Sequence, residues 1–226
     1  MLHSDRRCRM KDLIIIGSGG LGREAMWVAE RVNARSPEWN ILGFIDDNAE
    51  LTGTSVSGYP VLGTTADAVK YPDAYYICAI GNAKARRIVA EKVLSYAPVK
   101  FATLIDPACI HSDRVEFGEG CVICAYTYIT VDIKIGNHVY IGANCTVGHD
   151  AVVDDFVTLY PSVTLSGNTH IASGCELGTG SQIIQGLTVE KNTIVGAGSA
   201  VIRSLPSDCT AVGVPALPIK FHRKKA

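Results

Sequence analysis

The second half of the chain repeats with a period of six residues. From Phe117 to Val201 every sixth residue is large and apolar, which gives fifteen consecutive matches: Phe117, Ile123, Ile129, Ile135, Ile141, Val147, Val153, Leu159, Leu165, Ile171, Leu177, Ile183, Val189, Val195 and Val201. Two residues before each lies a second series, in which most side chains are small or β-branched. A hexapeptide period predicts a parallel β-helix, in which each repeat forms one short strand and one corner. Three repeats close a triangular coil, so the fifteen repeats predict about five coils.

The first half of the chain follows a different rhythm. Apolar runs suited to buried parallel strands occupy residues 12–17, 41–47, 75–82 and 101–106, and helix-like segments occupy about 23–33 and 83–96. This alternation predicts a small parallel sheet with helices. The expected fold class is therefore a Rossmann-like α/β half-domain (11–106) followed by an all-β parallel β-helix (107–205). Residues 1–10 are expected to be an N-terminal extension and residues 206–226 a solvated C-terminal tail.

The composition limits the partners of the chain. Its 226 residues contain 21 Lys and Arg against 22 Asp and Glu, a balance that does not indicate a nucleic-acid-binding surface. No apolar run reaches the roughly 18–20 residues of a membrane span, and the charged N-terminus lacks the apolar core of a signal peptide. We therefore expect a cytoplasmic protein with reduced thiols and no membrane partner. Met10 could be the natural start, with residues 1–9 as an upstream extension.

The Cys and His residues do not predict a metal site. Cys121 and Cys124 form a C-x-x-C, but no second pair follows at the spacing of a zinc site. His138 and His170 lie 11 and 21 residues from His149, and neither spacing is a multiple of one coil of three hexapeptides. The three side chains are therefore not expected to stack in one column, as a three-histidine zinc site on a β-helix would require.

A glycine-rich loop follows the first predicted strand. Gly17-x-Gly19-x-x-Gly22 lets the backbone approach a phosphate, and the helix that follows favours negative charge at its N-terminus. Asp46 and Asp47 close the second strand, where a carboxylate can accept hydrogen bonds from a ribose or a base. The pattern fits either NAD or a sugar nucleotide. Because a dinucleotide fold needs two such halves and this domain supplies one, we favour the sugar nucleotide. The alternative is a turn that binds no ligand.

His149 and Asp150 interrupt a repeat that otherwise needs only aliphatic and small side chains. A neutral imidazole can accept a proton near neutral pH, as acyl transfer to an amine or a hydroxyl requires. A carboxylate on the other ring nitrogen would fix the tautomer and stabilise the imidazolium. Asp150 is adjacent and could do this, although a water or a backbone carbonyl could serve instead. The alternative is a surface histidine beside a solvated aspartate.

Several motifs together resemble one known family. "IIIGSGGLGRE", "FIDDN", "GYPVLG" and "AIGN" precede hexads that contain "VGHD" and end with "IVGAGSAV" and "VGVPA". This combination, over about residues 11–220, resembles the left-handed β-helix acetyltransferases, in the subgroup of bacterial nucleotide-sugar N-acetyltransferases and sialic acid O-acetyltransferases. The resemblance implies the left hand of the coil, acetyl-CoA as acyl donor, and a homotrimer with active sites between neighbouring prisms.

The resemblance also implies roles for particular residues. The nucleotide-sugar site would be lined by Gly19, Gly20, Leu21, Asp46, Asp47 and Gly81. His149 would be the proton acceptor, with Asp150 raising its basicity, and the arm of CoA would lie against Thr179 and Ala197. The family often has a second histidine nine residues after the first, which contacts the thioester. Here Thr158 stands in that position, so Thr158, Tyr160 or backbone N–H groups would take over the contact.

Three functions remain open at this stage. The first is acetyl transfer to the amino group of a nucleotide-linked sugar in the synthesis of bacterial surface glycans. The second is O-acetylation of a sialic acid. The third is a non-catalytic scaffold that uses the β-helix as a trimer platform, although such a scaffold has no need for a paired base in a coil corner.

Overall fold

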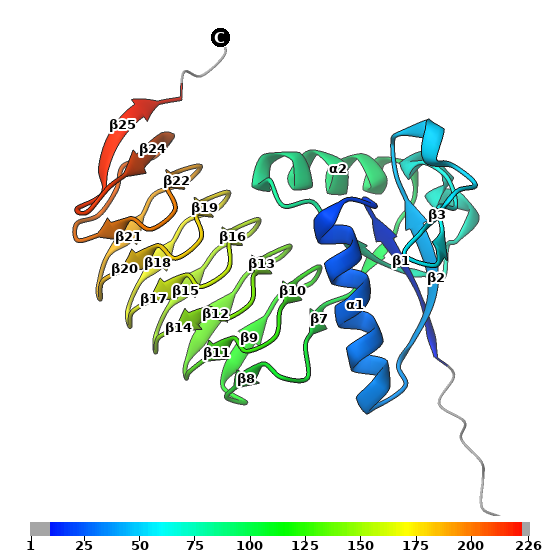
Figure 1. The fold of residues 1–226 in the computed structure, drawn as a ribbon, viewed down its shortest axis with the longest axis horizontal. Coiled ribbons are helices and arrows are strands. Elements are labelled where there is room, and N and C mark those ends of the chain that lie inside the picture. The colour runs from blue at the N-terminus through cyan, green and yellow to red at the C-terminus, as the bar shows by residue number, and fades with distance from the viewer. Residues whose placement is uncertain (1–9, 223–226) are drawn as a thin grey trace, which may run out of the picture.

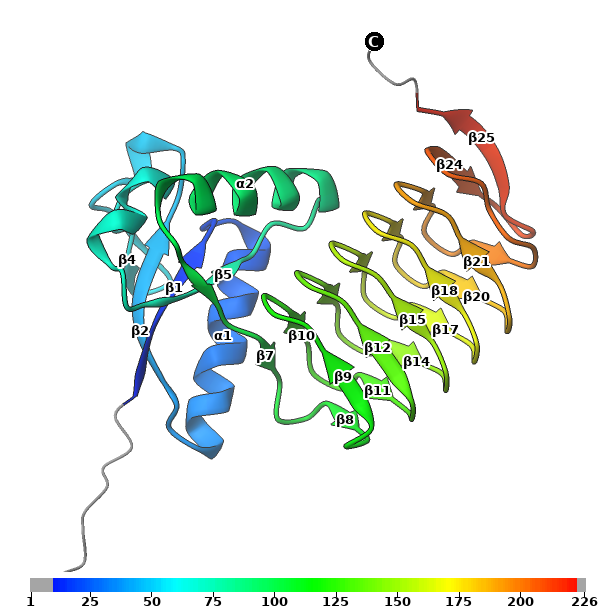
Figure 2. The ribbon, with the colours of Figure 1, turned by 180° about the vertical axis from the view of Figure 1, so that it is seen from behind.

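The computed structural model describes residues 10–222, which form an α/β domain beside a β-helix (Figure 1). The extension predicted for residues 1–10 therefore lies outside the described residues except for Met10. Figure 2 shows from behind that the coils of the β-helix lead away from the α/β domain and end at the C-terminal strands. None of the helices in the described range is both long enough and apolar enough to cross a bilayer.

The α/β domain is built on a parallel sheet with strand order β2-β1-β5-β6. Its strands are β1 (Lys11–Ile16), β2 (Trp39–Ile45), β5 (Tyr75–Cys78) and β6 (Lys100–Phe101), and its helices are α1 (Gly20–Arg35) and α2 (Ala83–Tyr96). Between β2 and β5 lie η1 (Ala49–Leu51), the hairpin strands β3 (Ser55–Val56) and β4 (Tyr59–Pro60), and η2 (Thr65–Lys70).

Strand β1 is buried on both faces, as its continuous apolar run predicts. Leu13 and Ile15 pack with α1, whereas Ile14 and Ile16 pack with α2, because successive side chains of a strand point to opposite faces. The cluster around α1 also contains side chains of the β-helix, among them Val122. Helix α1 is therefore buried between its own sheet and the β-helix, and one apolar core joins the two domains.

Three parallel sheets form the sides of the β-helix. Face 1 contains β7 (Leu104–Ile105), β10 (Val122–Ile123), β13 (Tyr140–Ile141), β16 (Thr158–Leu159), β19 (Glu176–Leu177), β22 (Ile194–Val195) and β24 (Cys209–Val212), with β25 (Leu217–Phe221) antiparallel at its end. Face 2 contains β8 (Ile110–His111), β11 (Tyr128–Ile129), β14 (Thr146–Val147), β17 (Thr164–Leu165), β20 (Gln182–Ile183) and β23 (Ala200–Val201). Face 3 contains β9 (Val115–Phe117), β12 (Ile133–Ile135), β15 (Val152–Val153), β18 (His170–Ile171) and β21 (Thr188–Val189).

The predicted apolar series forms the core of this β-helix. Each strand pairs with the strand one coil further on, so that Val147 lies beside Leu165 and Ile141 beside Leu159. Fourteen of the fifteen predicted positions are buried, and Phe117 at the first coil is partly buried. The predicted fold class, an α/β half-domain followed by a parallel β-helix, is confirmed.

Two sequence-based expectations about the ends of the β-helix were wrong. The segment 101–106 is not one strand of the α/β sheet, because β6 pairs with β5 while β7 pairs with β10 of the β-helix. The β-helix therefore begins before residue 107 and completes about six coils, not five. The expected tail from residue 206 contains β24 and β25, which extend face 1. Short apolar segments of two residues carry no periodicity that would reveal their sheet.

Each corner of the β-helix between positions 120 and 198 contains one residue with positive φ. These residues recur every six positions: Gly120, Tyr126, Asp132, His138, Asn144, Asp150, Phe156, Ser162, Asn168, Gly174, Gly180, Gly186, Asn192 and Gly198. Glycine, asparagine and aspartate accept this conformation most readily. Asp150 is one of these residues, with φ of 57°, so its place in the corner also suits its residue type.

His138 occupies such a corner but is buried, with 5% of its surface exposed. Its ring lies edge-on to Phe101 at 4.5 Å and is stacked on Phe156 at 4.8 Å between centroids. Burial, helped by the charge of Arg86 and opposed by Asp155, lowers the pKa of His138 to about 4. The folded state therefore keeps this ring neutral at a pH where an unfolded chain would protonate it.

We expect the stability of the protein to fall as the pH decreases from about 6.5 to 4. A histidine whose pKa is lowered by folding binds its proton more tightly in the unfolded chain, so acid favours unfolding by about 1.4 kcal/mol per pH unit in this window. Replacing His138→Phe should keep the ring stacking and make the Tm less dependent on pH. The control is His111→Phe, since the exposed His111 ring lies against Phe117. Equal acid sensitivity in His138→Phe and the wild type would contradict this explanation.

Candidate active site

His149 and Asp150 lie together in the turn that connects β14 of face 2 to β15 of face 3. The Nδ1 atom of His149 is 2.7 Å from Oδ2 of Asp150. About half of each side chain is exposed, 51% and 53%. Because an ionised carboxylate can only accept, Nδ1 carries the proton in the neutral ring and Nε2 carries the lone pair. The pair thus has the arrangement of a general base and its orienting carboxylate.

The neighbouring coils hold this turn. The N–H of Asp150 donates to the carbonyl of Val131 in the preceding coil, and the carbonyl of His149 accepts from the N–H of Asn168 in the next coil. Gly167 lies directly beneath the imidazole. A Cβ atom added to Gly167 would lie 2.5 Å from both Cε1 and Nε2 of His149. The imidazole ring can occupy this position because Gly167 has no side chain.

A cavity of about 340 Å³ lies at the carboxyl ends of β1, β2 and β5. The six residues predicted to bind the nucleotide sugar all line it: Gly19, Gly20, Leu21, Asp46, Asp47 and Gly81. They come from three loops, one after each strand, which is the edge of an open parallel sheet where ligands bind in such folds. The structure thus brings together the residues that the family resemblance implies for this site.

Both carboxylates at the end of β2 are held by hydrogen bonds. Asp46 accepts from the N–H and Oγ of Ser18 at 2.8 and 2.7 Å and from the N–H of Asn48 at 3.0 Å. Burial pushes its pKa up, but these hydrogen bonds outweigh burial and keep the pKa below its usual range. Asp47 accepts from Thr65 and from Lys92, with the same net result for its pKa. Asp46 thus fixes the glycine-rich loop as well as facing the cavity.

Only two of the three predicted donor-binding residues lie near each other. Thr179 and Ala197 are exposed and occupy successive coils of the corner between face 1 and face 2, where the N–H of Gly198 donates to the carbonyl of Thr179. Thr158 is fully buried between the two domains, with 0% exposed. Its hydroxyl donates to the carbonyl of Gly81 at 2.8 Å and accepts from Arg86 at 2.9 Å. The expected contact of Thr158 with a thioester is therefore corrected, because this hydroxyl has no exposed surface.

The cavity and His149 lie on different sides of the β-helix. The α/β domain contacts face 1, for example through Tyr140 and Glu24 at 3.3 Å and through Asn82 and Glu176 at 2.6 Å. The corner with His149 joins face 2 to face 3 and is therefore opposite face 1 in a triangular prism. Within one chain, the residues predicted for proton transfer therefore lie on a different side of the β-helix from those predicted to bind the nucleotide.

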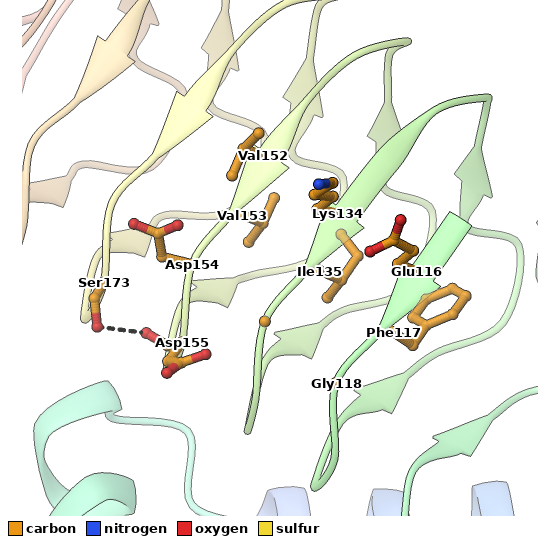
Figure 3. Close-up of a pocket in the computed structure, with 11 residues that line it drawn as sticks. Glu116, Phe117, Gly118, Lys134, Ile135, Val152, Val153, Asp154, Asp155 and Ser173 are labelled. Atoms are coloured by element: carbon orange, nitrogen blue, oxygen red, sulfur yellow. Dashed lines mark hydrogen bonds between the residues drawn. The ribbon is translucent and has the colours of Figure 1, made fainter. Parts of the chain in front are cut away.

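A second cavity of about 520 Å³ lies on face 3 and on the turns that lead from face 3 to face 1, and Figure 3 shows the residues that line it. None of the predicted site residues lines it. Asp154, one of its lining residues, pairs with Nε2 of His170 at 3.0 Å, and the carbonyl of Asp155 accepts from the hydroxyl of Ser173. His170 and Asp154 thus form a second His–Asp pair in the same β-helix. Within residues 10–222, no three His, Cys, Asp or Glu side chains gather closely enough to hold a metal ion.

Sequence reasoning missed several residues near the site. Arg86 and Glu176 connect α2 to face 1, but their roles depend on contacts between the domains that no local pattern contains. Gly167 could have been found, because it follows His149 by three hexapeptides, the length of one coil. A glycine one coil after a histidine indicates that the imidazole lies over backbone without a side chain.

Comparison with known proteins agrees with the fold. Two family models match the chain: the PglD N-terminal domain over residues 12–93, and the bacterial transferase hexapeptide (six repeats) over residues 132–167. The acetyltransferase domain of PglB from Neisseria gonorrhoeae FA1090 is 32% identical, with a TM-score of 0.83, over 92% of this chain and 100% of that chain. The same domain has been solved in complex with acetyl coenzyme A.

Two further relatives are more distant in sequence or in length. A variant of perosamine N-acetyltransferase from Caulobacter crescentus, in complex with CoA and GDP-perosamine, is 28% identical, with a TM-score of 0.82, over 92% of this chain and 97% of that chain. A serine acetyltransferase from Synechococcus elongatus is 35% identical over 92 residues, and the match spans only 38% of that protein. The chain thus spans less than half the length of this curated relative.

The fold and these relatives together place the chain among the acyltransferases of the β-helix class. More particularly, the chain belongs to the hexapeptide-repeat acetyltransferases that carry a PglD-type N-terminal domain.

We expect Gly167→Ala to disturb the position of the imidazole without disturbing the coil. The new methyl group must displace the His149 ring, whereas the backbone at Gly167 does not have the positive φ that would make alanine strained. A displacement of about 1 Å can lower turnover about 10²-fold. The measurement is kcat for acetyl transfer, with Tm as the check on folding. Gln185→Ala, one coil further along this corner, is the control, and a normal kcat in Gly167→Ala would contradict the role given to Gly167.

Proposed function

We propose that this protein is an acetyl-CoA-dependent N-acetyltransferase, which acetylates the amino group of a nucleotide-linked amino sugar in the synthesis of bacterial surface glycans. The observation that carries the proposal is the exposed His149–Asp150 pair, with Nε2 of the ring left to accept a proton. The cavity lined by the glycine-rich loop and the two aspartates supports a nucleotide as the carrier of the sugar. The relative crystallised with GDP-perosamine supports an amine as the acceptor rather than a sialic acid hydroxyl.

The reaction needs one base and no covalent intermediate with the enzyme. The sugar amine attacks the thioester carbonyl carbon, and Nε2 of His149 takes the proton that the nitrogen loses. Asp150 stabilises the resulting imidazolium through Nδ1–H. When the tetrahedral intermediate collapses, the C–S bond breaks and the imidazolium returns the proton to the thiolate of CoA. The products are the amide and CoA, and the imidazole is neutral again.

The proposal includes a homotrimer with active sites between subunits. Its support is the position of the two parts of the site: the cavity lies beside face 1, and His149 lies at the opposite corner of the β-helix. One chain therefore does not bring the base and the cavity together. In a closed ring of three subunits, the corner with His149 can approach the cavity of the neighbouring subunit. Thr179 and Ala197, at the corner next to face 1, would then contact the CoA arm. The cytoplasmic location stays a prediction.

We expect His149→Ala to fold normally and to lose about 10²–10⁴-fold in kcat, the usual effect of removing a general base. The KM for the sugar nucleotide should change little, because the proton is taken in the transition state. Asp150→Asn should lose less, since the ring remains but its imidazolium is less stabilised. The matched control is His170→Ala, which breaks the other His–Asp pair of the β-helix. If His170→Ala lost turnover and His149→Ala did not, the base would be assigned to the wrong pair.

The shared site can be tested by mixing two inactive variants. His149→Ala lacks the base, and the double variant Asp46→Ala, Asp47→Ala lacks the cavity carboxylates. If each site takes its base from one subunit and its cavity from the next, mixed trimers should regain activity, to about a quarter of the sites for equal random mixing. Co-expression followed by a kcat measurement checks this. Sites contained in single chains would show no recovery, and a monomer in sedimentation would rule out the trimer.

A further inference from the structure

Arg86 is a buried cation without a carboxylate partner. Only 2% of its surface is exposed, and it lies in the first turn of α2, at the contact with face 1. Its hydrogen bonds within the described chain go to uncharged oxygens: the carbonyls of Ile80, Gly81, His138, Phe156 and Val157, and the hydroxyl of Thr158. A buried charge normally has an ionic partner, so this arrangement requires an explanation.

The hydrogen bonds of Arg86 hold both peptide groups that flank Gly81. Nη1 donates to the carbonyl of Ile80 at 2.5 Å and to the carbonyl of Gly81 at 3.0 Å. The hydroxyl of Thr158 donates to the same Gly81 carbonyl at 2.8 Å. Two donors thus occupy the Gly81 carbonyl, and Thr158 is linked to both the carbonyl and the guanidinium. The loop between β5 and α2 is thereby fixed to strand β16 of the β-helix.

This fixation determines the direction of the Gly81 N–H. In a trans peptide the C=O and the N–H point in opposite directions. Because the Ile80 carbonyl points toward the buried Arg86, the N–H of Gly81 points away from it, and both Ile80 and Gly81 line the cavity. In the described chain this N–H donates to no protein acceptor, so it is available to a ligand.

The charge beneath the loop favours an anion at the same place. Burial lowers the pKa of Arg86, and Glu176 is the carboxylate whose charge raises it against that lowering. The oxygens of Glu176, however, accept hydrogen bonds from Asn82, from the N–H of Ala83 and from Tyr160. The glycine-rich loop and the start of α1, which follow the neighbouring strand β1, border the same cavity. A backbone donor backed by a buried guanidinium and the N-terminus of α1 therefore belong to the same cavity, and both favour an anion there.

We propose that Arg86 and Thr158 are positioning residues that direct the N–H of Gly81 at the diphosphate of the sugar nucleotide. The proposal rests on the proposed function for the identity of the ligand. It gives Thr158 a role in binding the acceptor substrate, in place of the contact with the acyl donor that the family resemblance implies. Neither side chain touches the ligand, since both act through the Gly81 peptide groups.

The test is Thr158→Val, which keeps the shape of the side chain and removes the hydroxyl. Titration calorimetry with GDP and with UDP measures binding without any acetyl transfer. We expect the Kd of whichever nucleotide binds the wild type to rise about fivefold to thirtyfold, the effect of losing one well-directed hydrogen bond near a charge. Thr158→Ser should restore the wild-type Kd. Thr193→Val is the matched control, because the buried Thr193 hydroxyl donates to the carbonyl of Pro206 in a distant coil.

The outcomes separate this inference from the proposed reaction. In steady-state kinetics, Thr158→Val should raise the KM for the sugar nucleotide and leave the KM for acetyl-CoA unchanged. A change in the acetyl-CoA KM alone, an unchanged nucleotide Kd, or a wild type that binds neither nucleotide would overturn the inference. A wild type that binds GDP or UDP but transfers no acetyl group would refute the proposed reaction and leave the role of Thr158 intact.

Discussion

The stacking of coils at intervals of three hexapeptides is the constraint on which the rest of this structure depends. Most strands of the β-helix are only two or three residues long, so none is stable by itself, and the stability comes from the apolar column and from hydrogen bonds between coils. The same register decides what lies above and below every corner residue. His149 lies over Gly167 for this reason, and the base owes its position to the backbone geometry of the coil.

A second interaction, the buried guanidinium of Arg86, connects the nucleotide-binding loops to that framework. It donates to carbonyls of both domains, so the loop after β5 cannot move without disturbing the coils of face 1. Burial of a cation without an ionic partner is unfavourable. The free-energy cost is smaller here because the guanidinium N–H groups all donate to uncharged oxygens. Together with the apolar cluster around α1, this interaction makes the two domains one unit whose cavity keeps a constant orientation to the β-helix.

Sequence reasoning predicted those features that depend on local pattern. The fifteen apolar positions, the helix at residues 83–96 and two loops of the cavity follow from periodicity or from residues adjacent in the chain, whereas the third loop, with Gly81, was implied by the family resemblance. It failed where a role depends on a distant partner. Thr158 occupies the aligned position of a family histidine, but its hydroxyl is directed toward Gly81 because Arg86 lies there. Likewise β6 and β7 are each two residues long, and only their partners distinguish their sheets.

The triangular cross-section then sets a condition for function. The α/β domain covers face 1 and contributes the cavity, while the corner opposite face 1 contains the His149–Asp150 pair. A prism cannot bring its own opposite sides together, since its core is filled with aliphatic side chains. An identical prism placed alongside can bring one copy's corner to another copy's cavity. The proposed reaction therefore requires a second copy of the chain, because it needs a proximity between base and cavity that the fold of one chain excludes.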